Sequence, residues 1–143
     1  MTAPNHIDLN LVRDSLRASN IAFQETDEVN VILATTSGIA FEFRFEQPHI
    51  SLVSTVAVEA ISSERFAEVL GWVQRYNYTS SLPCVVALKD ERRRLTVLEV
   101  KYDIPGAWQF TDRQFTEWLG NGISGVLDAV RAYVAALFLR RWA

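Results

Sequence analysis

Three glycines near the C-terminus have the spacing of a dinucleotide-binding loop. Gly120, Gly122 and Gly125 match the pattern G-x-G-x-x-G. In a dinucleotide site this pattern follows a strand and opens a helix whose N-terminus holds the pyrophosphate. Here the preceding residues, TDRQFTEWL, have helical spacing, and no strand-turn-helix unit surrounds the match. We therefore predict no cofactor, and we expect the glycines to break or kink a helix or to allow unusually close packing.

Few residues could act as a nucleophile, a general base or a metal ligand. Cys84 stands in the apolar segment CVVAL, where a buried thiol behaves as a small hydrophobic side chain. His6 lies near the N-terminus and His49 at the start of a predicted strand, and no pair of His or Cys residues has the spacing of a zinc site. No acid and base stand at a recognisable spacing for proton transfer. We expect no catalytic residue, no metal site and no enzymatic activity.

The densest group of charges is the segment Asp90-Glu91-Arg92-Arg93-Arg94. Charged loops are the norm on soluble proteins, so a hairpin turn kept soluble by its charges is the first interpretation. The alternative is a basic finger that contacts an acidic partner surface or nucleic acid. The segment lacks the interleaved aromatic residues of single-strand binders, and a net charge of −3 disfavours a binder of the phosphate backbone. We therefore predict no nucleic-acid partner.

The aromatic residues are the best candidates for a binding surface. Trp72 lies off the apolar stripe of its predicted helix, Trp108 lies in a predicted loop, and Trp142 lies in the C-terminal tail. Exposed Trp and Tyr side chains are favoured at protein interfaces because they bury much area at low entropic cost. We name as candidate protein-binding residues Trp72, Tyr76, Trp108 and Trp118. The alternative is that these side chains cap the edges of the core.

Apolar residues at helical spacing predict three helices. The middle one covers residues 62–77, begins at serines that can cap it, and has a stripe formed by Phe66, Val69, Leu70, Val73 and Tyr76. A first helix is predicted over residues 8–19. The last helix begins after a capping box, in which Thr111 is followed three residues later by Gln114.

Five strands are predicted between these helices. The clearest covers residues 39–46, where aromatic and aliphatic residues alternate with Ala, Glu and Arg, so that one face suits a core and the other suits water. Strands are also expected over residues 29–34 and 50–58, and a hairpin over residues 84–103. The order α-β-β-β-α-β-β-α predicts an α+β fold, with an antiparallel sheet and helices packed on one side.

The length and composition of the chain favour one soluble domain over residues 1–143. A chain of 143 residues is long enough to bury a sizeable core, and its single cysteine excludes an internal disulfide. The first ten residues, MTAPNHIDLN, lack the basic start and apolar core of a signal peptide. No apolar run approaches the roughly 18 residues that a membrane span needs. We expect a cytoplasmic protein without a membrane partner.

The central segment also resembles a known family. The segments LGWVQRYN and PCVVALKDERRRLTVLEVKYDIPG, together with the order of elements, resemble the YbjN-like proteins, which are described as candidate bacterial sensory transduction regulators. In that family the middle helix ends in an aromatic-Asn pair, here Tyr76-Asn77, and a Gly-containing turn, here Pro105-Gly106, leads into the last helix at Thr111. The resemblance implies the fold of type III secretion chaperones, which work as homodimers and hold an extended segment of a client protein.

These observations lead to two functional expectations. The first is a non-enzymatic protein-binding module, chaperone-like or regulatory and homodimeric, that takes up a partner segment on an exposed edge strand or in an aromatic groove. The alternative is a small-molecule or nucleotide sensor domain whose pocket is lined by the same aromatic residues.

Overall fold

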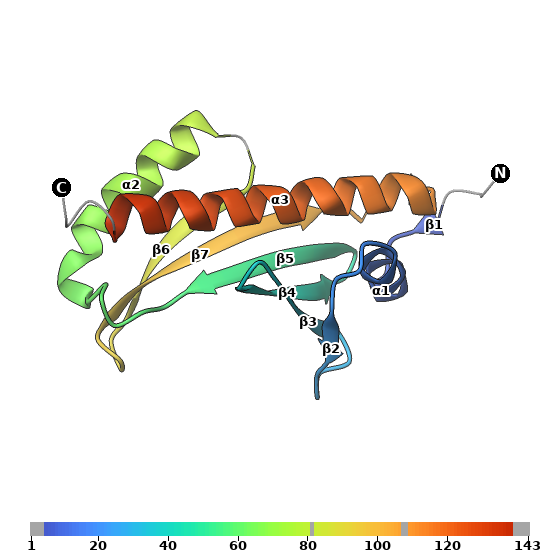
Figure 1. The fold of residues 1–143 in the computed structure, drawn as a ribbon, viewed down its shortest axis with the longest axis horizontal. Helices are drawn as coiled ribbons and strands as arrows, with labels where there is room; N and C mark the ends of the chain where they lie inside the picture. The colour runs from blue at the N-terminus through green and yellow to red at the C-terminus, as the bar shows by residue number, and fades with distance from the viewer. Residues whose placement is uncertain (1–4, 81, 107–108, 139–143) are drawn as a thin grey trace. The chain divides into compact units, whose positions relative to one another are not determined.

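The computed structural model describes residues 5–80, 82–106 and 109–138. The elements, in order, are β1 (Asn5–His6), α1 (Leu9–Ala18), β2 (Phe23–Glu25), β3 (Val31–Thr36), β4 (Ile39–Glu46), β5 (His49–Val56), the short 3-10 helix η1 (Ser63–Arg65), α2 (Phe66–Thr79), β6 (Cys84–Asp90), β7 (Leu95–Ile104), β8 (Gln109–Phe110) and α3 (Asp112–Leu137) (Figure 1). No helix in this part of the chain is long and apolar enough to cross a membrane.

The strands confirm the predicted α+β class and the predicted order of elements. Six strands follow one another in the sheet as β2-β3-β4-β5-β7-β6, and β1 pairs separately with β8. The pairs β2–β3, β3–β4, β4–β5 and β6–β7 are all antiparallel. Three short strands, β1, β2 and β8, were not predicted, because they have two or three residues each and show too little alternation to be recognised.

The chain divides into two compact units. The first contains the residues up to Val53 together with Tyr102–Ser124, and the second contains Ser54–Lys101 together with the residues from Gly125 onward. The elements β5, β7 and α3 contribute residues to both units. That the chain is one domain stays a prediction.

The core of the first unit is built on the alternation of β4. Phe41 and Phe43 are buried, and their rings meet edge to face at 5.7 Å between centroids. The register places Phe43 between Ile32 of β3 and Leu52 of β5, which are both fully buried. A cross-strand pair of an aromatic and a β-branched side chain, such as Phe43 and Ile32, stabilises a sheet. The predicted aromatic core face is therefore confirmed.

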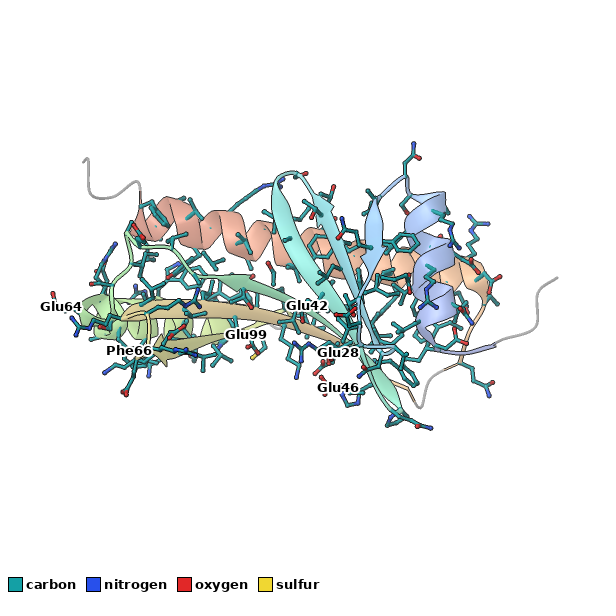
Figure 2. The ribbon with its side chains drawn as sticks, turned by 90° about the horizontal axis from the view of Figure 1, so that it is seen from below. Glu28, Glu42, Glu46, Glu64, Phe66 and Glu99 are labelled. Atoms are coloured by element: carbon teal, nitrogen blue, oxygen red, sulfur yellow. The ribbon has the colours of Figure 1, made fainter. Side chains whose placement is uncertain are left out.

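The opposite face of β4 carries charges, as predicted. The guanidinium of Arg44 donates to the carboxylate of Glu42 at 2.7 Å, and this bond raises the pKa of Arg44. Glu28 and Glu46 add to that effect through their charge, and Figure 2 shows both on the side of the sheet where Glu42 lies. Such exposed pairs contribute little to stability, because water screens them.

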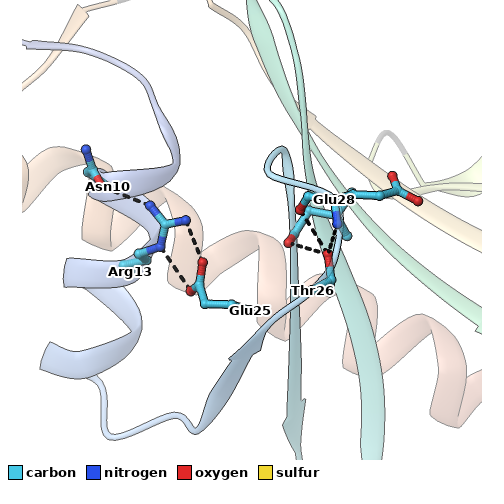
Figure 3. Close-up of polar contacts among 6 residues, drawn as sticks. Asn10, Arg13, Glu25, Thr26 and Glu28 are labelled. Atoms are coloured by element: carbon cyan, nitrogen blue, oxygen red, sulfur yellow. Dashed lines mark hydrogen bonds and ion pairs between the residues drawn. The ribbon is translucent and has the colours of Figure 1, made fainter.

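Helix α1 is capped at its N-terminus and connected to β2 by an ion pair. Asp8 caps its N-terminus by accepting from the backbone N–H of Leu11 at 3.0 Å. Arg13 forms two hydrogen bonds with Glu25 of β2, at 3.1 and 2.7 Å, and this paired geometry lowers the pKa of Glu25 (Figure 3). The hydroxyl of Thr26, also drawn in Figure 3, accepts from the N–H of Glu28 at 3.1 Å and so shapes the next loop.

In the second unit, α2 packs with a different face from the one expected. Val69 and Val73 are buried as predicted, but Leu70 is 36% exposed. Trp72, which we expected off the stripe, is half-buried and contacts the buried ring of Tyr133 at 5.2 Å. The packed face is therefore centred on Val69 and Val73 and turned toward Trp72. Helical spacing predicts a wide stripe, and the neighbouring elements decide which of its edges is covered.

Helix α3 runs without a break through its three glycines, so the expected helix break is wrong. Its N-terminus has the predicted capping box, in which Thr111 N–H donates to Gln114 at 3.0 Å and Gln114 N–H donates to Thr111 at 3.2 Å. In the first unit, a Cβ at Gly122 would lie 2.7 Å from the ring of Tyr102. In the second unit, a Cβ at Gly125 would lie 3.3 Å from Pro83. The alternative expectation, unusually close packing, is therefore correct for Gly122.

Candidate functional site at the edge of β6

Strand β6 is the last strand of the sheet and leaves one side of its backbone without a neighbouring strand. Among the described strands it pairs with β7 alone, with Val85 opposite Val100 and Leu88 opposite Val97. Helix α2 packs along β6 within the second unit (Figure 1). We call the backbone groups of Val85, Ala87 and Lys89 that point away from β7 the β6 edge.

The direction of these groups follows from a side chain of α2. The amide nitrogen of Asn77 donates to the carbonyl of Val85 at 2.8 Å, and its oxygen accepts from the N–H of Val85 at 3.0 Å. Because neighbouring residues of a strand alternate their hydrogen-bonding direction, the N–H and C=O of Ala87 and Lys89 also point away from β7. Within the described residues, those two backbones form no hydrogen bond on that side.

Apolar side chains stand exposed beside the β6 edge. Val86 and Leu88 are 39% and 43% exposed, on the face of the hairpin that also carries Cys84. The register places Glu99 of β7, labelled in Figure 2, opposite Val86. Cys84 was predicted to be buried, and this is wrong, because the segment CVVAL forms an edge strand with one open face. An open edge with adjacent apolar side chains is the usual template for binding another strand.

The turn between β6 and β7 is ordered by Asp90. Its carboxylate accepts from the backbone N–H of Arg93 at 3.0 Å and from the Nε of the same residue at 2.6 Å. These bonds lower the pKa of Asp90, the backbone bond most strongly. The predicted hairpin and its charged turn are therefore present, with Arg92, Arg93 and Arg94 all exposed. We call residues 89–94 the hairpin tip.

The hairpin tip is also anchored at its β7 side. The carbonyl of Arg94 accepts from the N–H of Ser63 at 2.9 Å, and the hydroxyl of Thr96 donates to the carbonyl of Ser62 at 2.8 Å. Arg94 has a φ of 57°, a left-handed conformation that a residue with a side chain adopts only when its surroundings hold it there. These bonds hold the backbone of the hairpin tip in place, and the charged side chains extend from it.

Two of the predicted binding residues lie together on α2. The rings of Trp72 and Tyr76 are stacked, with centroids 5.0 Å apart, and both are half-buried. Burial raises the pKa of Tyr76. Since Trp72 also contacts Tyr133, the pair packs α2 against α3 within the second unit. A role of Trp72 and Tyr76 in binding a partner stays a prediction.

A third predicted residue, Trp118, belongs to the first unit. Its ring lies 6.3 Å from that of Tyr102 and 6.4 Å from that of Phe110. With Phe110 it lines an open pocket of about 380 Å³, whose other lining residues are Gln109, Gln114, Glu117 and Asn121. The fourth predicted residue, Trp108, lies outside the described residues. Of the predicted residues that the structure describes, Trp72 and Tyr76 therefore lie together in the second unit, and Trp118 lies in the first unit.

Among residues 5–80, 82–106 and 109–138, no three His, Cys, Asp or Glu side chains are placed to hold a metal ion. His49 lies 3.8 Å from Glu46, an exposed pair at a strand turn.

Sequence reasoning missed the backbone of β6 and the contribution of Asn77. Asn77 belongs to the aromatic-Asn pair with Tyr76, and nothing in its local sequence shows that its amide reaches a strand residue eight positions away. The segment that contains Val86 and Leu88 predicts an apolar strand, but its sequence does not indicate which face of that strand is exposed. The position of a strand within its sheet is set by tertiary structure, so alternation alone does not reveal an edge.

The comparisons with known proteins bear on the fold. Among solved structures, the chain is similar to YbjN of E. coli, described as a candidate transcription regulator. The two share 13% sequence identity with a TM-score of 0.70, over 91% of this chain and 96% of that chain. No protein-family model matches the chain, and no curated protein matches it. The chain therefore has the YbjN-like fold that its resemblance implied.

Proposed function

We propose that this chain is a non-enzymatic protein-binding module, chaperone-like or regulatory, that takes up an extended segment of a partner protein on the β6 edge. The observation that carries the proposal is the open backbone of Ala87 and Lys89 beside the exposed side chains of Val86 and Leu88. The likeness to YbjN, itself described as a candidate regulator, agrees with a regulatory or binding role.

Strand addition suits this edge for two physical reasons. The N–H and C=O groups of Ala87 and Lys89 offer up to four backbone hydrogen bonds, each worth about 0.5–1.5 kcal/mol net. A strand seated there would also cover Val86 and Leu88, and burying apolar area contributes about 25 cal/mol per Å². Asn77 already forms with Val85 the two hydrogen bonds that a strand backbone would form. A partner strand would therefore pair with Ala87 and Lys89 and stop before Val85.

We also propose that the protein is a cytoplasmic homodimer. Two copies of β6 can pair antiparallel about a two-fold axis, because such an interface uses the same surface of both copies. A dimer of this kind would compete with a client for the β6 edge. Light scattering on the wild-type chain and on an Ala87→Pro variant tests the proposal, since proline removes an edge donor and obstructs a neighbouring strand.

The experiment that tests the binding function compares capture by matched variants. The tagged wild-type protein and a Val86→Asp/Leu88→Asp variant are used to capture partners from the native host. Val29→Asp is the control, because Val29 is 92% exposed and lies far along the chain from β6. The proposal predicts a near-stoichiometric partner that is retained by Val29→Asp and lost with the β6 variant. Equal recovery by all three proteins would place binding elsewhere.

The pocket beside Trp118 favours a second candidate function, a sensor of a small aromatic molecule or nucleotide. A ring could stack on Trp118 and Phe110 while the amides of Gln109 and Asn121 hydrogen-bond its polar edge. Thermal shift against a metabolite panel tests this candidate, because a ligand that binds only the folded state raises the melting temperature. A shift that disappears in Asn121→Ala would support the sensor, and no shift in the panel would leave it without support.

A further inference from the structure

The hairpin tip carries a positive charge in an acidic protein. Its six residues contain four basic and two acidic side chains, a net charge of +2, whereas the whole chain has a net charge of −3. Arg93 is held by Asp90, with 2.6 Å between its Nε and the carboxylate. Arg92 and Arg94 form no ion pair with any described residue. Two guanidinium groups are therefore available to an external anion.

A groove joins Arg92 and Arg93 to the apolar face of the hairpin, and Arg94 is the next residue along the tip. It has a volume of about 470 Å³ and is lined by Leu88, Lys89, Asp90, Glu91, Arg92, Arg93 and Val97. Leu88 and Val97 are register partners, so their side chains stand next to each other on one face. The groove therefore combines apolar side chains with three basic and two acidic ones, and this excess of positive charge suits a peptide with both aliphatic and acidic side chains.

The groove adjoins the β6 edge directly. Leu88 and Lys89 line it, and Lys89 is also the last outward-pointing residue of that edge. A strand bound along Ala87 and Lys89 would therefore reach the hairpin tip with its next residues. Because antiparallel pairing is the more stable arrangement, the residues that reach the tip would precede the paired residues in the partner's sequence.

Resting on the proposed function, we infer that the partner segment has an acidic run immediately before its β6-pairing residues. Its carboxylates pair with Arg92 and Arg94, and an aliphatic side chain covers Leu88 and Val97. Arginine is the side chain best suited to carboxylates because its planar fork binds both oxygens. A nucleic acid fits less well, because no aromatic side chain lines the groove to stack with its bases.

Binding of synthetic peptides tests this inference on the full chain. The probes are the fluorescein-labelled octapeptides DDDVTVTV and NNNVTVTV, and a form of DDDVTVTV with methylated backbone nitrogens in its VTVTV half. We expect DDDVTVTV to bind about tenfold more tightly than NNNVTVTV at low salt, in line with a few exposed ion pairs. The difference should shrink in about 0.5 M salt, where such pairs are screened. The methylated peptide should not bind, because it cannot donate to the β6 edge.

A charge-reversed pair of variants identifies the groups involved. Arg92→Glu/Arg94→Glu should remove the preference for the acidic peptide, while Arg113→Glu/Arg131→Glu, which changes the net charge equally at exposed sites of α3, should keep most of it. Circular dichroism shows whether each variant is folded.

The other outcomes separate this inference from the proposed function. Equal binding of the acidic and neutral peptides, unaffected by the tip variant, would overturn the acidic preference and leave edge binding in place. Binding of the methylated peptide as tight as that of its parent would show attraction to arginine without strand pairing, and would overturn the inference. No binding of any peptide would overturn both proposals.

Discussion

The side chain of Asn77 forms two hydrogen bonds with the backbone of Val85, one as donor at 2.8 Å and one as acceptor at 3.0 Å. A residue in the last turn of α2 thereby occupies the place that a neighbouring strand would take at the start of β6. The rest of the edge, at Ala87 and Lys89, keeps the same orientation. This relationship both fixes α2 to the hairpin and defines where a partner strand can begin.

Replacing Asn77 by alanine should lower the free energy of unfolding by about 1–2 kcal/mol, because both backbone groups of Val85 lose their partner. Urea denaturation measures the change. Gln74→Ala, one turn earlier on the exposed side of α2, is the matched control and should have little effect. Equal effects of the two substitutions would show that the loss comes from the helix and not from the bonds to Val85.

Two glycines of α3 should respond in opposite directions to alanine. At Gly120 a Cβ meets nothing within 4 Å, so Gly120→Ala should stabilise the protein by about 0.5–1 kcal/mol through its higher helix propensity. At Gly122 a Cβ would lie 2.7 Å from the ring of Tyr102, so Gly122→Ala should destabilise it by about 1–3 kcal/mol. Thermal denaturation of both variants checks the contrast. A stabilising Gly122→Ala would mean that the Tyr102 ring moves freely.

Stability should fall at alkaline pH through Tyr133. Its side chain is fully buried, its hydroxyl has no hydrogen-bond partner among the described residues, and burial raises its pKa to about 12. An unfolded tyrosine ionises near pH 10, so above that pH the unfolded state releases a proton that the folded state keeps. The free energy of unfolding should therefore be intact below about pH 10 and fall by up to about 1.4 kcal/mol per pH unit toward pH 12.

The variant Tyr133→Phe isolates this contribution from the other buried tyrosines. Removing an unpartnered buried hydroxyl costs little, so its stability at neutral pH should match or slightly exceed that of the wild type. Urea denaturation at about pH 9 and 11 should show that the free energy of unfolding falls less with pH in the variant than in the wild type. Identical pH dependence in both proteins would show that Tyr133 ionises as in water.

Replacing Trp72 should affect the stability of the protein as well as its binding to any partner. Its stacking on Tyr76 and its contact with Tyr133 predict that Trp72→Ala lowers the free energy of unfolding by about 2–4 kcal/mol, with the secondary structure retained. Trp72→Phe keeps an aromatic contact and should lose less. Far-ultraviolet circular dichroism and urea denaturation measure both variants. If Trp72→Ala is as stable as the wild type but loses its partner, Trp72 is a binding residue, as first predicted.

The order of elements could be predicted because each long element carries its own periodic signal. In β4, Phe41 and Phe43 alternate with charged residues, and this pattern has only one reasonable interpretation. The capping box of Thr111 and Gln114 marked the start of α3 in the same local way. The glycines of α3 could not be interpreted locally, because the reason for Gly122 is the ring of Tyr102, twenty residues earlier in the sequence.

The candidate site could not be predicted, because an edge is a property of the whole sheet. Val85, Val86 and Leu88 are similar in sequence, yet Val85 is buried and the other two are exposed. The difference arises because Val85 lies on one face of the strand and Val86 and Leu88 lie on the other, and only tertiary structure shows which face is covered. The aromatic residues could be named as candidates because a sequence shows which residues are large and aromatic. It does not show which backbone N–H groups lack a partner strand.

Amide hydrogen exchange in β6, measured by NMR with and without the peptide DDDVTVTV, tests the central claim most directly. In the free protein the N–H of Val85 should exchange slowly because Asn77 accepts it, and those of Ala87 and Lys89 should exchange fast. With the peptide bound, exchange at Ala87 and Lys89 should slow by at least about tenfold, as a newly paired strand requires. A bound peptide that leaves Ala87 and Lys89 unprotected would contradict the claim that this edge is the binding site.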